Sequence, residues 1–171
     1  MPVDVRFFAP LGSLSLGELA KQTGSGLFGD EDLELTGISS AANGRRGDLG
    51  FLDGDGKSAI EINPDISALV VNDANVARIP DGIPYIISKF PRYVHGTAAV
   101  KLFRPRHLDW HGESAISPDA TVDESVKIAP GAAIAPGAVI GAGTFIGANA
   151  VIGPGVQIGR NCVIGPAATV F

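Results

Sequence analysis

The sequence predicts a small α+β domain followed by a parallel β-helix of hexapeptide repeats, and two observations lead to this fold class. The first is a six-residue period of aliphatic side chains through the C-terminal third of the chain. The second is the absence of this period before residue 104, where short helix and strand patterns alternate instead. The periodic aliphatic positions are Ile116, Val122, Ile128, Ile134, Ile140, Ile146, Ile152, Ile158, Ile164 and Val170.

A six-residue period fits neither the 3.6-residue repeat of a helix nor the two-residue repeat of a strand. Hexads of this kind are typical of a parallel β-helix, in which three hexads form one coil and the aliphatic side chains stack inward. We therefore expect three coils over residues 114–171. The tight corners between strands need positive φ, which Gly and Asn adopt most readily. The predicted corner residues are Gly131, Gly137, Gly143, Asn149, Gly155 and Asn161.

The first predicted element is a helix that begins after Ser15 and ends near Thr23. Ser15 and Glu18 have the spacing of a capping box, in which the Ser hydroxyl accepts a hydrogen bond from the backbone of the third helical residue. Leu14 precedes this cap and is placed to pack against Leu19. The glycine at position 24 then predicts the end of the helix, because a left-handed residue commonly follows the last turn.

Four short apolar stretches predict strands between this helix and a second one. A Pro at the first position favours a second helix over Pro91–Phe103, with Val94, Ala98 and Leu102 on its buried side. We therefore divide the chain into an α+β domain over residues 1–103, a polar connector over 104–113 and the β-helix over 114–171. The predicted strands lie at residues 33–38, 49–52, 68–71 and 85–87.

Composition excludes several classes of function. The net charge of −5 and the pI near 5.0 provide no basic surface for nucleic acid. No apolar run reaches about eighteen residues, so we expect no transmembrane segment, and the N-terminus is a poor signal peptide. The single cysteine, Cys162, falls on a small inward position of a hexad and is interpreted as a packing residue. No cluster of His, Cys, Asp or Glu has metal-ligand spacing, and a cytoplasmic protein is expected.

The order of the segments along the chain resembles that of a known family. The segments SLGELAKQTG, GDLGFLD, SALVVND, IISKFPRYVHGTAAVKLF and the hexads from Ile116 onward cover nearly the whole sequence. In this order they resemble the UDP-3-O-acyl-glucosamine N-acyltransferases of lipid A biosynthesis. The resemblance implies a left-handed β-helix, a homotrimer with active sites between subunits, and no cofactor. It also implies transfer of a 3-hydroxyacyl chain from acyl carrier protein to the 2-amino group of UDP-3-O-acyl-glucosamine.

The resemblance also points to candidate substrate-binding residues. In the family, the segment that matches 51–57 begins with a Phe that stacks on uracil, followed by an Asn that reads the base and a second aromatic ring. Phe51 retains the first ring, whereas Gly54 stands at the Asn position and Lys57 at the aromatic position. Phe51 and Lys57 are therefore the candidate substrate-binding residues. Phe51 is equally compatible with a core position in a strand.

No catalytic residue is assigned within this chain. The family's general base is a histidine of a later coil, which would lie beyond Phe171, and the sequence stops within a repeat. His95, His107 and His111 all precede the first hexad and are interpreted as solvated surface residues. We therefore expect the 171-residue chain alone to be inactive, as the N-terminal half of such an enzyme. Two alternatives stay open: a non-catalytic nucleotide-sugar-binding module, and a coil module that only drives assembly.

Overall fold

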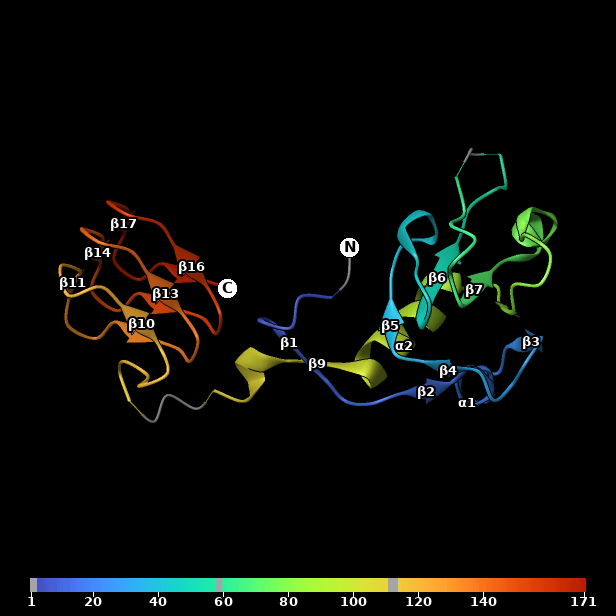
Figure 1. The fold of residues 1–171 in the computed structure, drawn as a ribbon, viewed down its shortest axis with the longest axis horizontal. Helices are drawn as coiled ribbons and strands as arrows, with labels where there is room; N and C mark the ends of the chain where they lie inside the picture. Colours follow the sequence, from blue (N-terminus) through green and yellow to red (C-terminus); the bar gives the residue numbers. More distant parts are fainter. Residues whose placement is uncertain (1–2, 58–59, 111–113) are drawn as a thin grey trace. The chain divides into compact units, whose positions relative to one another are not determined.

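The computed structural model describes residues 3–57, 60–110 and 114–171, which form two compact units. The first unit contains Pro10–Arg104, and the second contains Pro105–Phe171 together with the N-terminal segment Asp4–Ala9 (Figure 1). No sequence pattern indicates that this N-terminal segment groups with the coils. Within the described residues, no helix is both long enough and apolar enough to cross a membrane.

A five-stranded mixed sheet organises the first unit (Figure 1). Its four strands from β5 to β8 run parallel to one another, and β3 pairs antiparallel with β8 at one edge. In spatial order the strands are β3 (Gly26–Phe28), β8 (Tyr85–Ile87), β7 (Ala68–Val71), β6 (Asp48–Leu52) and β5 (Gly37–Ile38). Side chains alternate between two buried clusters, so that Val70 joins one cluster while Leu69 and Val71 join the other.

Two helices pack into the first of these clusters. Helix α1 spans Leu16–Thr23, and helix α2 spans Pro91–Leu102. The Ser15 hydroxyl accepts a hydrogen bond from the Glu18 backbone at 3.1 Å, and Gly24 closes α1 with φ 61°. The predicted cap and stop of α1 are therefore confirmed. The buried side of α2 also agrees with the prediction, since its fully buried side chains include Val94, Ala98 and Leu102.

The single strand predicted at residues 33–38 is wrong, because this segment forms two short strands with different partners. β4 (Glu34–Leu35) pairs antiparallel with β2 (Leu14–Ser15), whereas β5 pairs parallel with β6. The backbone of Thr36, between the two strands, donates to the carbonyl of Gly47 at 2.9 Å. The alternating pattern is local and cannot reveal that the chain changes partner in its middle.

The remaining short elements of the two units were not anticipated. β1 (Phe8–Pro10) and β9 (Phe103–Pro105) form a two-stranded sheet. The 3₁₀ turns are η1 (Ala41–Asn43), η2 (Asp73–Arg78) and η3 (Arg106–Leu108). The predicted polar connector therefore contains part of a strand and a turn within its described residues.

The second unit consists of parallel coils, as the hexad period predicts. Nine two-residue strands form three parallel three-stranded sheets, one on each side of the coil. Each strand pairs with the strand three hexads later, so that Val122 faces Ile140 and Ile140 faces Ile158. The strands are β10 (Thr121–Val122), β11 (Lys127–Ile128), β12 (Ala133–Ile134), β13 (Val139–Ile140), β14 (Phe145–Ile146), β15 (Val151–Ile152), β16 (Gln157–Ile158), β17 (Val163–Ile164) and β18 (Thr169–Val170).

The inward aliphatic column forms the core of this unit. Its central members Ile134, Ile140, Ile146 and Ile152 are buried, and the members on either side pack against them. Ile116 is 43% exposed and makes only an isolated bridge to Ile134. All six predicted corner residues have positive φ, and Ala167 joins them with φ 57°. The repeat therefore predicts both the inward side chains and the corners correctly.

Candidate functional site

The aromatic ring of Phe51 is the centre of the candidate site on the first unit. Phe51 lies in β6 next to β7 and is half-buried, so its ring is neither fully inside the core nor free in solvent. Two side chains from the first turns of α2 lie against it. The guanidinium carbon of Arg92 is 6.0 Å from the ring centroid, and the imidazole centroid of His95 is 4.9 Å away at a tilt of 51°.

Arg92 also forms an ion pair with the residue two positions after Phe51. Its Nε lies 2.9 Å from Oδ2 of Asp53, while the Arg92 side chain remains 77% exposed. Asp53 in turn accepts a hydrogen bond from the backbone of Gly54 at 2.8 Å. The ring, the guanidinium and the carboxylate thus form a connected cluster at the end of β6.

The loop after β6 is fixed in place by η2 and the residue before it. Asn72 and Asn75 both donate from Nδ2 to the carbonyl oxygen of Gly54, at 2.9 Å and 3.3 Å. Gly56 has φ 75°, and a Cβ there would lie 2.5 Å from the carbonyl of Ala74, so no larger residue fits without a shift of the backbone. The candidate residue Lys57 follows this glycine, is exposed, and lies 3.9 Å from Asp55.

His95 differs from the interpretation as a solvated surface residue, which is therefore wrong for this position. Its Nε2 lies 3.1 Å from the carbonyl oxygen of Leu49, and α2 packs the imidazole against the sheet. Burial lowers the pKa of His95, although backbone hydrogen bonds to Leu49 and Ser39 oppose the shift. A neutral imidazole in this position can support the Phe51 ring without placing a second positive charge beside Arg92.

The other two histidines follow α2 in the sequence, and His107 belongs to the second unit. The ring centroid of His107 is 5.4 Å from that of Phe171, and its side chain is exposed. His111 lies outside the residues that the structure describes.

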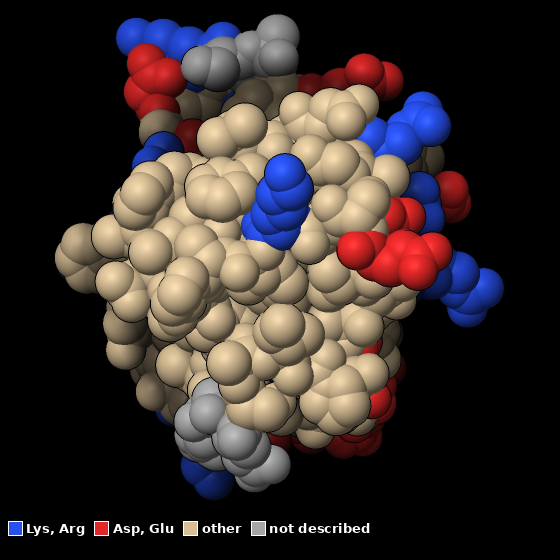
Figure 2. Space-filling model, turned by 90° about the vertical axis from the view of Figure 1, so that its left-hand side faces the viewer, with Lys and Arg blue, Asp and Glu red and all other residues tan. Residues whose placement is uncertain are grey.

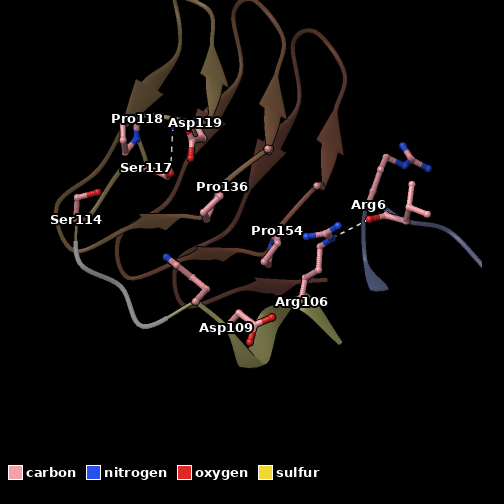
Figure 3. A pocket seen from close by; sticks show the side chains of 13 residues that line it. Arg6, Arg106, Asp109, Ser114, Ser117, Pro118, Asp119, Pro136 and Pro154 are labelled. Carbon is pink, nitrogen blue, oxygen red and sulfur yellow. Dashed lines mark hydrogen bonds between the residues drawn. The ribbon is translucent and has the colours of Figure 1, made fainter. Parts of the chain in front are cut away.

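The second unit has a cavity of about 610 Å³ along one corner of its coils (Figure 3). A column of prolines, Pro118, Pro136 and Pro154, lies on its coil side. Arg106 lines it from η3 and donates from Nε to the carbonyl of Val5 at 2.8 Å. None of the described residues that line this cavity is a histidine, lysine or cysteine, and its polar lining consists of Arg, Asp and Ser side chains.

This unit also has a separate apolar cavity and a coil face with few charges. The cavity, of about 410 Å³, is lined mainly by aromatic side chains, including Phe7, Phe8 and Phe171. The outer positions of β14 and β17 carry Phe145 and Val163, which are 38% and 76% exposed. Figure 2, which views the side where β11, β14 and β17 lie in Figure 1, shows a broad area with few charges. Within the described residues, no group of His, Cys, Asp and Glu could hold a metal ion.

Comparison with known proteins agrees with this architecture. The model of the bacterial transferase hexapeptide family (six repeats) matches residues 137–171. A protein of Rhizobium johnstonii named UDP-3-O-acylglucosamine N-acyltransferase is 32% identical over 130 residues, which cover 73% of this chain and 36% of that protein. A protein of the same name from Granulibacter bethesdensis is 34% identical over 129 residues, covering 75% and 37%. Another from Cupriavidus taiwanensis is 26% identical over 125 residues, covering 68% and 34%.

Matches of this length reach well beyond the hexads of residues 114–171 into the first unit. The chain is related to the UDP-3-O-acylglucosamine N-acyltransferases. It spans about a third of the length of the N-acyltransferases that it matches. Hexapeptide coils occur in many transferases, so the shared first unit is what distinguishes this family from other hexapeptide proteins.

The N-acyltransferase resemblance predicts Phe51 and Lys57 as site residues, and the structure adds two side chains that sequence reasoning missed. Arg92 and His95 reach the Phe51 ring from α2, while Lys57 pairs with Asp55 instead. The sequence does contain one signal that Arg92 and His95 act together: they are three positions apart, which places them side by side on one face of a helix. Only the packing of α2 on β6 shows that this face meets Phe51.

Proposed function

We propose that the chain is the acceptor-binding and early-coil part of a UDP-3-O-acylglucosamine N-acyltransferase of lipid A biosynthesis. The observation that carries the proposal is a match of 125 to 130 residues to proteins of that name, longer than the coil segment alone. The proposed reaction moves a 3-hydroxyacyl chain from acyl carrier protein to the 2-amino group of UDP-3-O-acyl-glucosamine. The proposal includes left-handed coils and a homotrimer, as the resemblance implies.

The proposed chemistry sets clear requirements. The amine nitrogen forms a bond to the thioester carbonyl carbon, the C–S bond breaks, and the thiol leaves with a proton. A base must take a proton from the attacking amine, and a donor must stabilise the oxyanion. Residues 114–171 contain no histidine, so this part of the coils supplies no imidazole for the first task. The part of the reaction that this chain supports best is acceptor binding.

Phe51 is the residue that we assign to the uracil ring of the acceptor. Its half-buried ring at the end of β6 has a fixed orientation and is accompanied by a cation, features that suit stacking of a planar base. Lys57, exposed on the loop that follows β6, is assigned to the same substrate as a positively charged side chain.

Calorimetry with UDP-N-acetylglucosamine tests this assignment. Replacing Phe51 by Ala should weaken binding by about tenfold or more, because stacking of a base on an aromatic ring contributes roughly 1–3 kcal/mol. Phe28→Ala is the matched control, since Phe28 is a partly exposed ring of the same unit that stacks on Tyr85. Equal affinities for the parent chain and the Phe51→Ala variant, or no binding at all, would reject the assignment.

A further inference from the structure

Arg92 takes part in two interactions that a bound nucleotide would disturb. Its guanidinium covers the Phe51 ring at 6.0 Å from the centroid and pairs with Asp53 through Nε at 2.9 Å. The side chain is nevertheless 77% exposed, so it can change its rotamer without disturbing the core. Among the described residues, Asp53 is the only acidic side chain that forms an ion pair with Arg92.

The spacing leaves no room for a base between the guanidinium and the ring. A base sandwiched there needs two van der Waals contacts of roughly 3.5 Å each, or about 7 Å in total. The observed separation is 6.0 Å. A base that stacks on this face of Phe51 must therefore displace the Arg92 guanidinium.

The energetics favour a new partner for the displaced guanidinium. An exposed ion pair such as Arg92–Asp53 stabilises by less than roughly fivefold in an equilibrium constant, because water screens both charges. Hydrogen bonds to a phosphate contribute more, on the order of tenfold to hundredfold, and the planar guanidinium matches phosphate oxygens in a bidentate manner. Exchange of the Asp53 carboxylate for a phosphate group is thus favourable, whereas simple release of Arg92 is not.

We propose that the Phe51 site selects a nucleoside diphosphate over a nucleoside, and that Arg92 moves from Asp53 to the diphosphate when the base stacks on Phe51. This inference rests on the proposed function, since it concerns the same site. A nucleoside without phosphates must displace Arg92 and offers it no replacement acceptor. Asp53 acts as the competitor that holds Arg92 over the empty ring.

The test measures the affinities of the full chain for UDP and for uridine by calorimetry. The parent chain should bind UDP at least roughly tenfold more tightly than uridine. Arg92→Ala should weaken UDP binding by about tenfold or more and leave uridine binding unchanged or slightly stronger, because the ring is uncovered. Asp53→Asn should strengthen UDP binding several-fold, since the amide oxygen can still accept the Gly54 hydrogen bond while the competing charge is removed.

Lys101→Ala is the matched control, because Lys101 is an exposed cation in the last turn of the same helix. Both affinities of this variant should equal those of the parent chain. If Arg92→Ala weakens UDP and uridine equally, or leaves the ratio of the two affinities unchanged, the role of Arg92 is overturned. If Phe51→Ala changes neither affinity, the proposed function fails as well, so the two failures are distinguishable.

Discussion

The buried hydroxyl of Thr144 links two successive coils. Thr144 occupies a small inward corner position, where its Oγ1 donates to the carbonyl of Gly159 at 2.9 Å and accepts from the backbone of Cys162 at 3.0 Å. Thr144→Val keeps the shape but removes both hydrogen bonds to the backbone of the next coil. We expect this variant to lower the free energy of unfolding of the coil unit by about 1–3 kcal/mol.

Fluorescence of Trp110, the single tryptophan of the chain, followed during urea unfolding should report this loss. Trp110 belongs to the coil unit, so the signal is separate from unfolding of the first unit. Thr144→Ser retains the hydroxyl and should lose less stability than Thr144→Val. Equal losses in the two variants would contradict a specific contribution of the hydroxyl, because only Thr144→Val removes it.

His95 should make the stability of the first unit dependent on pH. Because burial lowers the folded-state pKa of His95 below the usual histidine value of about 6.5, the unfolded chain binds a proton more readily than the folded chain. The stabilising effect of the neutral imidazole is therefore present above about pH 6.5 and is lost as the pH falls below it. Thermal melts between pH 7.5 and 5.5 should show a larger decrease for the parent chain than for His95→Gln. Parallel decreases in the two chains would contradict a lowered pKa.

At the scale of a single strand, substitution by Asp should lower the stability of the coil unit far more at one residue of β13 than at its neighbour. Ile140 is 1% exposed in the inward column, whereas Val139 points outward and is 40% exposed. Ile140→Asp should unfold the coil unit, because an unpaired buried charge costs several kcal/mol. Val139→Asp should change stability by only about 0.5 kcal/mol, as is usual for an exposed position. Circular dichroism melts compare the two, and similar melting temperatures would refute the inward assignment of Ile140.

Helices, strands and coils were predictable wherever the signal is local. The cap at Ser15, the buried side of α2 and the corner glycines depend on residues a few positions apart. Pairing between distant segments has no such local signal. The two strands within residues 33–38, the edge strand β3 and the grouping of Asp4–Ala9 with the coils all depend on distant partners. Sequence reasoning therefore predicted the repeat unit more completely than the first unit.

The candidate site follows the same rule. Phe51 was identified from the resemblance of residues 51–57 to a segment of the family, whereas Arg92 is about forty positions away and becomes relevant only because α2 packs on β6. The prediction that His95 is a solvated surface residue was wrong for the same reason, since the imidazole contacts the carbonyl of Leu49 in that strand. Residue type alone could not show which cation would lie over the ring.

At the scale of the whole molecule, the coil face formed by β11, β14 and β17, which carries few charges (Figure 2), favours self-association. Phe145 and Val163 lie on adjacent strands of one sheet, and exposed apolar groups of this kind mark interaction surfaces. We expect a homotrimer by light scattering and a shift to smaller species in Val163→Asp. Gln157→Asp, at an exposed outer position of a different sheet, should leave the assembly unchanged. A parent chain that stays monomeric at high concentration would contradict this prediction.

The purified 171-residue chain should show no N-acyltransferase turnover, even though it should bind the nucleotide part of the acceptor. Attack by the amine needs a base within hydrogen-bond reach, and the coil segment 114–171 contains no histidine. His95 is committed to a backbone carbonyl beside Phe51, and the His107 ring lies against Phe171. The assay combines the chain, acyl-loaded carrier protein and the 3-O-acylated acceptor, with a full-length relative as positive control. Turnover above the uncatalysed background would contradict this prediction, and substitution of His107 and His111 in turn would test whether a histidine outside the coils acts as the base.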